Sequence, residues 1–244
     1  MAKSNSKFKF YAKYVWQLIK DSLPSGIMYL CAGCILMMAT IKMREDNAFT
    51  FKNAALFWII FCPVVAAAYN ALMSWANGGQ QYEMLVSGNI RRSTEQTYGA
   101  GYKIGKYKEE KEYRIWKGFV VGGLMAFFAI LVGIVWGVKQ SRIDARLADM
   151  EIGLSETLGI ILSGWSVMPI YYANAMGANI SYFVSLVFAL VPIGVTAGFY
   201  IWGAYARRNK RLREQAIADR ASQSNKPQKI NYGGLPGTKP KKKK

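Results

Sequence analysis

Five apolar runs without a charged residue constrain this chain more than any other feature of its sequence. They cover residues 25–41, 54–76, 118–138, 157–176 and 180–206. All Lys and Arg residues lie outside these runs, although the chain is 52% hydrophobic and carries a net charge of +18. Apolar runs of about 20 residues match the thickness of a bilayer, and basic flanks anchor them. The sequence therefore predicts an all-α polytopic integral membrane protein.

The basic residues predict which side of the membrane each connection occupies. Residues 1–24, 77–117 and 206–244 carry 26 of the 32 Lys and Arg. Because positive residues remain in the cytosol, we expect both termini and the 77–117 insert on the cytosolic side of a membrane, most simply the plasma membrane. This placement requires an even number of spans.

One of the five runs therefore cannot cross. Residues 157–176 are interrupted by Gly159, Gly164 and Pro169, and an interrupted segment is tolerated at membrane depth only where protein or a water cavity covers its backbone. We expect four transmembrane helices plus this broken segment, either re-entrant or peripheral. The alternative is five full spans with the basic tail outside.

The same pattern divides the chain into five parts. We expect a basic amphipathic N-terminal segment (1–24), a first transmembrane hairpin (25–76), a cytosolic polar insert (77–117), a second membrane unit (118–206), and a basic cytosolic tail (207–244) that is disordered after about residue 220. At the end of the insert, Arg114 and Lys117 are expected to reach lipid phosphates.

Glycines spaced four apart suggest where helices pack closely, since a glycine face lets two backbones approach. Helix-packing positions are predicted at Gly118, Gly122, Gly133, Gly137, Gly194 and Gly198. The first four share one helical face. Packing within the chain is the simpler interpretation, and homodimerisation is the alternative.

Uncharged polar residues inside the runs could line a polar cavity for a small or lipidic solute. The candidates are Asn70, Ser163, Ser166 and Asn174. Such groups also bond between helices, which is the more common role. No charged residue lies inside a run, which disfavours an ion-coupled carrier.

The basic tail is placed to contact anionic lipid headgroups. The candidate residues are Arg207, Arg208, Lys210, Arg211 and Arg213. The terminal lysines could reach nucleic acid or the ribosome through phosphate attraction. A simple determinant of topology is the alternative role for the whole tail.

Several chemistries are disfavoured by residue types and spacing. The chain has no His, so the most common general base and metal ligand is missing. Cys31 and Cys34 have CxxC spacing, but no basic neighbour would stabilise a thiolate, and small packing residues are expected there. The glycines of residues 98–106 do not fit a phosphate-binding loop. We expect no catalytic site, metal or cofactor.

These features favour a non-enzymatic structural or accessory subunit of a membrane assembly, with a protein partner or a second copy. The alternative is a channel or transporter component for a small or lipidic solute. A third hypothesis is an insertase-like factor with a ribosome-reaching tail, although no run carries the positive charge usual in such a groove.

Overall fold

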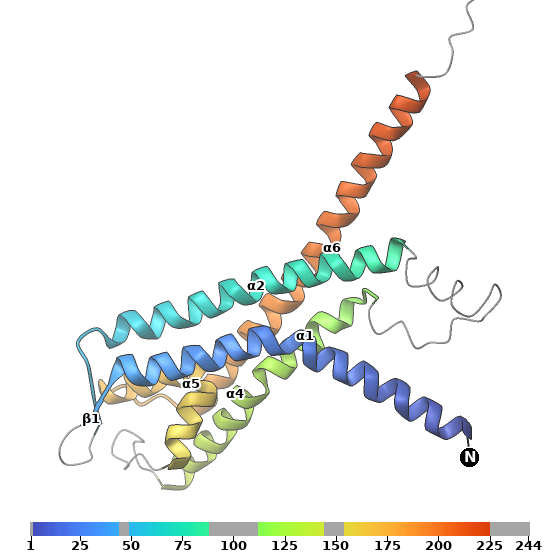
Figure 1. Ribbon diagram of the computed structural model, residues 1–244. Helices are drawn as coiled ribbons and strands as arrows, with labels where there is room; N and C mark the ends of the chain where they lie inside the picture. The colour runs from blue at the N-terminus through green and yellow to red at the C-terminus, as the bar shows by residue number, and fades with distance from the viewer. Residues whose placement is uncertain (1, 44–48, 88–111, 144–153, 225–244) are drawn as a thin grey trace, which may run out of the picture. The chain divides into compact units, whose positions relative to one another are not determined.

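The computed structural model describes residues 2–43, 49–87, 112–143 and 154–224, and the chain forms two compact units, Met1–Arg207 and Arg208–Lys244. Five helices make up nearly all of the described chain (Figure 1): α1 (Ala2–Thr40), α2 (Ala55–Ser87), α4 (Ile115–Ile143), α5 (Leu154–Ala175) and α6 (Ser185–Ser224). The short elements are the strands β1 (Ile41–Met43) and β2 (Phe49–Phe51) and a 3₁₀ turn, η3 (Tyr182–Val184).

Four of the helices are long and apolar enough to cross a membrane. The qualifying segments are Tyr11–Thr40, Ala55–Val86, Ile115–Ser141 and Tyr182–Ala221. They belong to α1, α2, α4 and α6, which confirms the predicted all-α architecture with four candidate spans. α5 is not among them.

α1 departs from the predicted division of the chain at residue 24. The segment expected to be separate, 1–24, continues without interruption into the first apolar run as one helix of 39 residues. α1 changes direction along its length (Figure 1) and contains Pro24. Proline removes one backbone hydrogen bond and bends a helix without ending it when neighbouring helices support it.

The polar insert is also shorter than predicted, because helices extend into both of its ends. α2 continues to Ser87, and α4 begins at Ile115. Gly78, Gly79 and Gln81 are buried. The first part of the insert is therefore a packed helix, and residues 88–111 lie outside the described residues.

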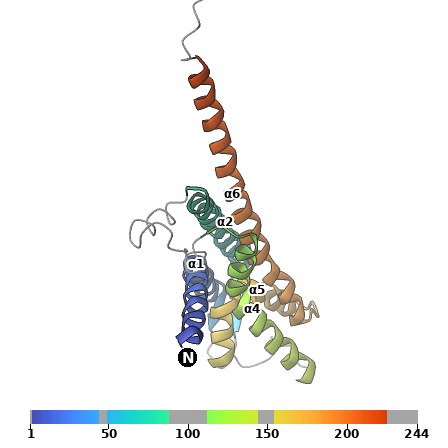
Figure 2. The ribbon, with the colours of Figure 1, turned by 90° about the vertical axis from the view of Figure 1, so that its right-hand side faces the viewer.

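α1 is the central helix of the Met1–Arg207 unit. It packs against α2, α4 and α5, and Figures 1 and 2 both place it beside α2. A Cβ built on Gly33 of α1 would collide with the backbone oxygen of Ile161 in α5. Only glycine permits this approach, so Gly33, between Cys31 and Cys34, is a packing residue.

α5 is broken in its middle. Ser163 has non-helical backbone angles (φ −140°, ψ 15°), and the two halves of α5 run in different directions in Figure 1. The Ser163 hydroxyl donates to the Gly159 oxygen at 2.7 Å, and Ser166 donates to the Ser163 oxygen at 2.8 Å. These side chains bond backbone oxygens at the break, inside the protein.

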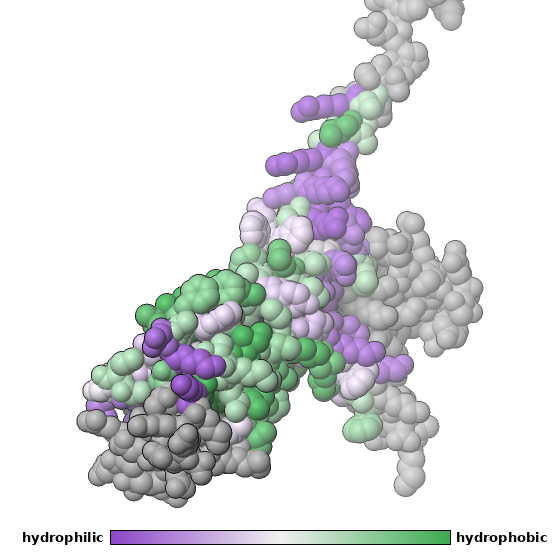
Figure 3. All heavy atoms as spheres, turned by 60° about the vertical axis from the view of Figure 1, so that its left-hand side comes forward, coloured by the Kyte–Doolittle hydropathy of each residue, from purple (hydrophilic) through white to green (hydrophobic). Residues whose placement is uncertain are grey.

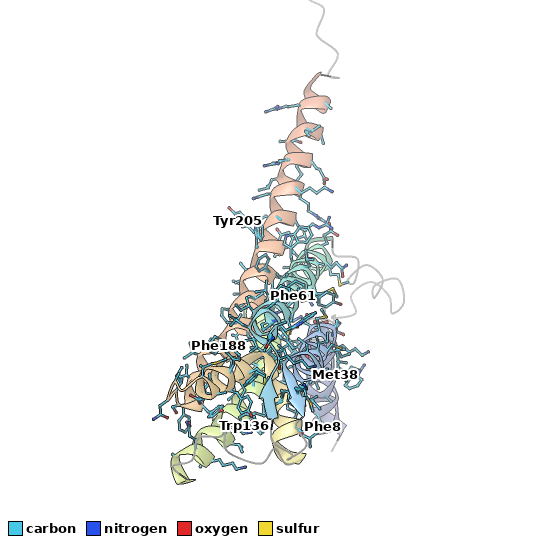
Figure 4. All side chains as sticks on the ribbon, turned by 90° about the vertical axis from the view of Figure 1, so that its left-hand side faces the viewer. Phe8, Met38, Phe61, Trp136, Phe188 and Tyr205 are labelled. Carbon is cyan, nitrogen blue, oxygen red and sulfur yellow. The ribbon has the colours of Figure 1, made fainter. Side chains whose placement is uncertain are left out.

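The outer surface of the unit is apolar. Figure 3 shows hydrophobic residues over much of its visible face. Phe8, Met38, Phe61 and Phe188 are exposed, whereas Trp136 is buried against Tyr182 (Figure 4). Large exposed apolar side chains on long helices suit contact with lipid chains.

Candidate functional site: a buried polar cluster between four helices

A chain of hydrogen-bonded side chains joins three helices near one end of the bundle. Tyr200 of α6 donates its hydroxyl to Oε1 of Gln81 at 2.6 Å. Gln81 of α2 donates from Nε2 to Oδ2 of Asp21, in α1, at 2.9 Å. Oδ1 of Asp21 accepts a second bond, from Gln17, at 2.9 Å. The buried amide of Gln81 therefore connects α1 to α6.

Lys117 adds a fourth helix and a positive charge to this cluster. Its side chain is 1% exposed, although it lies in the first turn of α4. Its Nζ donates to the Glu112 backbone oxygen at 2.6 Å and lies 5.3 Å from the ring centroid of Tyr14. The expected contact of Lys117 with lipid phosphates is wrong, because this side chain turns inward.

The charge of Lys117 attracts Asp21, although it favours the carboxylate less than the hydrogen bonds from Gln17 and Gln81 do. Taking either charge out of water alone would be costly, and a nearby partner offsets part of that cost. Ionisable groups within membrane helices are rare and usually mark functional positions. This cluster, formed by Asp21, Gln81, Lys117 and Tyr200, is the candidate functional site.

Aromatic rings close the cluster on two sides. Tyr113 stacks on Tyr200 with centroids 5.1 Å apart, and Tyr14 stacks on Trp116 at 5.4 Å. Burial raises the pKa of the Tyr113 phenol above its ordinary value, so Tyr113 stays neutral at physiological pH. The rings shield the charges from water, which strengthens their attraction.

The chemistry of the cluster favours a role in positioning helices. Both oxygens of Asp21 and the amide oxygen of Gln81 already accept hydrogen bonds. Within the described part of the chain, no group of three His, Cys, Asp or Glu could hold a metal ion. The direct effect of these contacts is to hold α1, α2, α4 and α6 in fixed positions relative to one another.

The four residues expected to line a polar cavity bond to three different sets of partners. Asn70 donates to Thr196 of α6 at 3.0 Å and accepts from Ser74 at 3.2 Å. Ser163 and Ser166 bond within α5. Asn174 donates to the Ile180 oxygen at 3.0 Å and accepts from its N–H at 2.8 Å. Among these hydrogen bonds, that of Asn70 to Thr196 joins α2 to α6.

The four glycines of α4 that were predicted to pack lie along its contact with the chain segment from Tyr182 to Tyr200. Gly118 faces Ala197 and Tyr200, and Gly122 faces Pro192 and Ile193. Gly133 and Gly137 face the start of α6 and the ring of Phe183 in η3.

The glycine pair of α6 is placed differently from the α4 pairs. Among the described residues, no heavy atom lies within 4 Å of a Cβ built on Gly194 or Gly198, so neither position makes the predicted close contact within the described part of the chain. The close approach of α6 to α2 instead uses Gly203, against the Trp75 backbone, and Gly78, against the Tyr200 backbone. Neither was predicted as a packing position.

The basic residues expected to contact lipid fall on both sides of the boundary between the two units. Arg207 pairs with Glu83 at 3.1 Å within the first unit. Arg208, Lys210 and Arg213 are exposed on the helical part of the second unit, whereas Arg211 is half-buried. Lys210 lies 3.8 Å from Glu214, a weak surface pair. Residues 225–244, with the terminal lysines, lie outside the described residues.

The three cysteines are free thiols that differ in their exposure to solvent. Cys31 is exposed, Cys34 half-buried and Cys62 buried.

No protein-family model, curated protein or solved structure matches this chain. The residues and their geometry therefore carry the functional argument alone.

Sequence reasoning missed the cluster because its members lie at or beyond the ends of the apolar runs. A signal was nevertheless present. Tyr14, Leu18, Asp21 and Ser25 recur every three or four residues, in phase with the buried Tyr29. That spacing continues one helical face across residue 24.

Proposed function

We propose that this protein is a non-enzymatic, multi-pass structural or accessory subunit of a membrane assembly. The observation that supports this most is the use of interior polar groups. Tyr200, Gln81 and Asp21 bond to one another across helices, as do Asn70 and Thr196. The polar side chains inside the bundle therefore connect helices to one another. The apolar outer face is free to contact lipid or a partner.

The proposed orientation follows the basic residues. Both termini and the insert lie in the cytosol, at the plasma membrane, because most Lys and Arg then remain inside. α5 is proposed to be re-entrant. Its break at Ser163, its buried central residues and its exclusion from the four candidate spans support this assignment.

The basic tail is proposed to contact anionic lipid headgroups or an acidic partner. Arg208, Lys210 and Arg213 are exposed on one helical segment, and each basic residue near an acidic leaflet contributes about 1 kcal/mol of binding. Contact with nucleic acid or the ribosome would depend on the terminal lysines.

The test combines topology with assembly. Reporter fusions at the C-terminus and between residues 43 and 49 should report opposite sides of the membrane. Chemical crosslinking in native membranes, followed by native gels in mild detergent, should place the protein in a particle of defined stoichiometry larger than one 27.3 kDa chain. A single chain in membranes and in detergent would overturn the accessory role.

A second candidate function, a channel or transporter component, is favoured by Asp21 and Lys117. Charged groups within membrane helices commonly belong to solute or ion pathways. The purified protein in liposomes would then conduct a solute, and Asp21→Asn would change that flux. Tight vesicles with and without the protein would exclude this candidate.

A further inference from the structure

α1 is longer than a membrane requires. Its candidate span, Tyr11–Thr40, has 30 residues, or about 45 Å at 1.5 Å per residue. A hydrocarbon core of about 30 Å takes up about 20 of these. Counted back from Thr40, about 20 residues reach Asp21, which lies in the charged cluster. The residues before Asp21 then lie at the membrane surface.

This first part of α1, residues 8–20, is called the N-terminal arm. One side of it is held by the bundle. Tyr14 and Leu18 are buried in the core, and the Tyr14 ring stacks on Trp116 at the start of α4. The arm is therefore docked along one side, with its remaining faces turned outward.

An apolar stripe occupies the outward side of the arm. Its members are Phe8, Tyr11, Val15 and Trp16, which are 75%, 65%, 53% and 56% exposed. At 100° per residue, Phe8, Tyr11 and Val15 lie within about 60° of one another, and Trp16 lies at the edge of the stripe, about 80° from Phe8. Aromatic side chains of this kind are enriched at the boundary between headgroups and acyl chains.

The charges beside this stripe are positive. Lys13 and Lys20 are exposed, and Lys20 lies 5.6 Å from the ring centroid of Trp16. Asp21, the one acid of residues 1–24, accepts hydrogen bonds from Gln17 and Gln81. A leaflet of anionic lipid has an apolar acyl region and negatively charged headgroups. The apolar stripe complements the acyl region, and the two lysines complement the headgroups.

We infer that the N-terminal arm of α1 is a docking surface for a leaflet containing anionic phospholipid. Phe8, Tyr11, Val15 and Trp16 enter the acyl boundary, and Lys13 and Lys20 bind phosphates. A second copy of the chain is a poorer occupant, because two such arms would bring their lysines together. The inference rests on the membrane location of the helices and not on the accessory role.

The experiment uses the full chain in nanodiscs of pure phosphatidylcholine or with 30% phosphatidylglycerol. Cys31, Cys34 and Cys62 are replaced by Ser, and Val15→Cys carries a spin label. In anionic discs the label should be accessible to oxygen and protected from an aqueous nickel complex. In neutral discs, and after Lys13→Gln with Lys20→Gln, the equilibrium constant for docking should fall about 25-fold, since each lysine contributes about fivefold.

Two controls separate lipid docking from other causes. Lys210→Gln with Arg213→Gln removes two exposed cations of the second unit and should leave the Val15 label unchanged. Hydrogen exchange of residues 8–20 in the chain with its native cysteines should show the same lipid dependence. Equal nickel access in both lipids would overturn the inference. Spin–spin broadening that is independent of lipid charge would assign the surface to a second copy instead.

Discussion

The two ends of the helix bundle are held by different chemistry. At one end, Asp21, Gln81, Lys117 and Tyr200 bond or attract side chain to side chain across four helices. At the other, Asn174 and Gln140 bond backbone groups of Ile180 and Tyr182 before α6.

This difference has a consequence for stability. A substitution of Asn174 or Gln140 leaves the backbone groups of Ile180 and Tyr182 in place. Near a surface, water can replace the hydrogen bond that such a backbone group loses. At the cluster the partners are the buried side chains of Gln81 and Tyr200. A buried polar group that loses such a partner has no water to replace it. Substitutions should therefore be more damaging at the cluster than at the opposite end.

Lys117→Met should have the largest effect. It removes a buried ammonium that donates to the Glu112 oxygen and lies beside the Tyr14 ring, and it keeps most of the side-chain volume. We expect a loss of about 3 kcal/mol in the free energy of unfolding, at the upper end for a lost hydrogen bond from a charged group. Thermal unfolding in detergent, followed by circular dichroism, measures the change.

Lys210→Met is the matched control, since Lys210 is exposed, and it should be neutral. Asp21→Asn combined with Lys117→Met should restore part of the lost stability, because no charge is then left unpaired. Equal losses for Lys117→Met and Lys210→Met would mean that burial of Lys117 in the cluster does not set its sensitivity.

Gly122→Leu tests the region between the two ends. A Cβ on Gly122 would lie 2.7 Å from the Cα of Ile193, whereas one on Gly123 meets nothing within 4 Å. Leu at position 122 should force α4 from α6 and cost about 2 kcal/mol, and Leu at position 123 should cost much less. The free energy of unfolding is measured for both variants, which have the same amino-acid composition. Equal stabilities would argue against a close α4–α6 contact.

Gln81→Leu and Gln140→Leu compare the ends with one residue type. Gln81 loses bonds to Asp21 and Tyr200, both inside the protein, so we expect about 2 kcal/mol. Gln140 is half-buried and bonds two backbone groups, so about 1 kcal/mol is expected. The reverse order in denaturant unfolding would contradict the assignment of the cluster as the more sensitive end.

Arg207→Gln should have the smallest effect. Its pair with Glu83 lies at the cluster end but is well exposed on both sides. Exposed pairs contribute about 0–1 kcal/mol, so stability should change by less than about 0.5 kcal/mol. A loss as large as that of Lys117→Met would mean that position in the bundle, rather than burial, sets the sensitivity.

The number of candidate spans could be predicted because it depends on a local property. Residues 118–138, for example, are continuous and uncharged, and nothing distant can alter that. The broken character of α5 followed in the same way from Gly164 and Pro169, although the break itself lies at Ser163.

The candidate site could not be predicted because its contacts are distant in sequence. Asp21 and Gln81 are 60 residues apart, and Gln81 and Tyr200 are 119 apart. Helix ends also extended past the apolar runs, so polar residues assigned to loops lie inside packed helices. The sequence also could not distinguish packed from unpacked glycines, because both kinds have the same GxxxG spacing. Gly122 packs against α6, whereas Gly194 faces open space.

Gln81 gives the cluster a direction. The Tyr200 hydroxyl points to the Gln81 oxygen, and the Gln81 amide points to Asp21, so the dipoles align head to tail toward the carboxylate and reinforce one another. Glu at position 81 would oppose Asp21, and Lys would offer Tyr200 no acceptor. Any lineage that changes residue 21 or 200 must therefore change residue 81 to match, and these three positions should evolve as one unit.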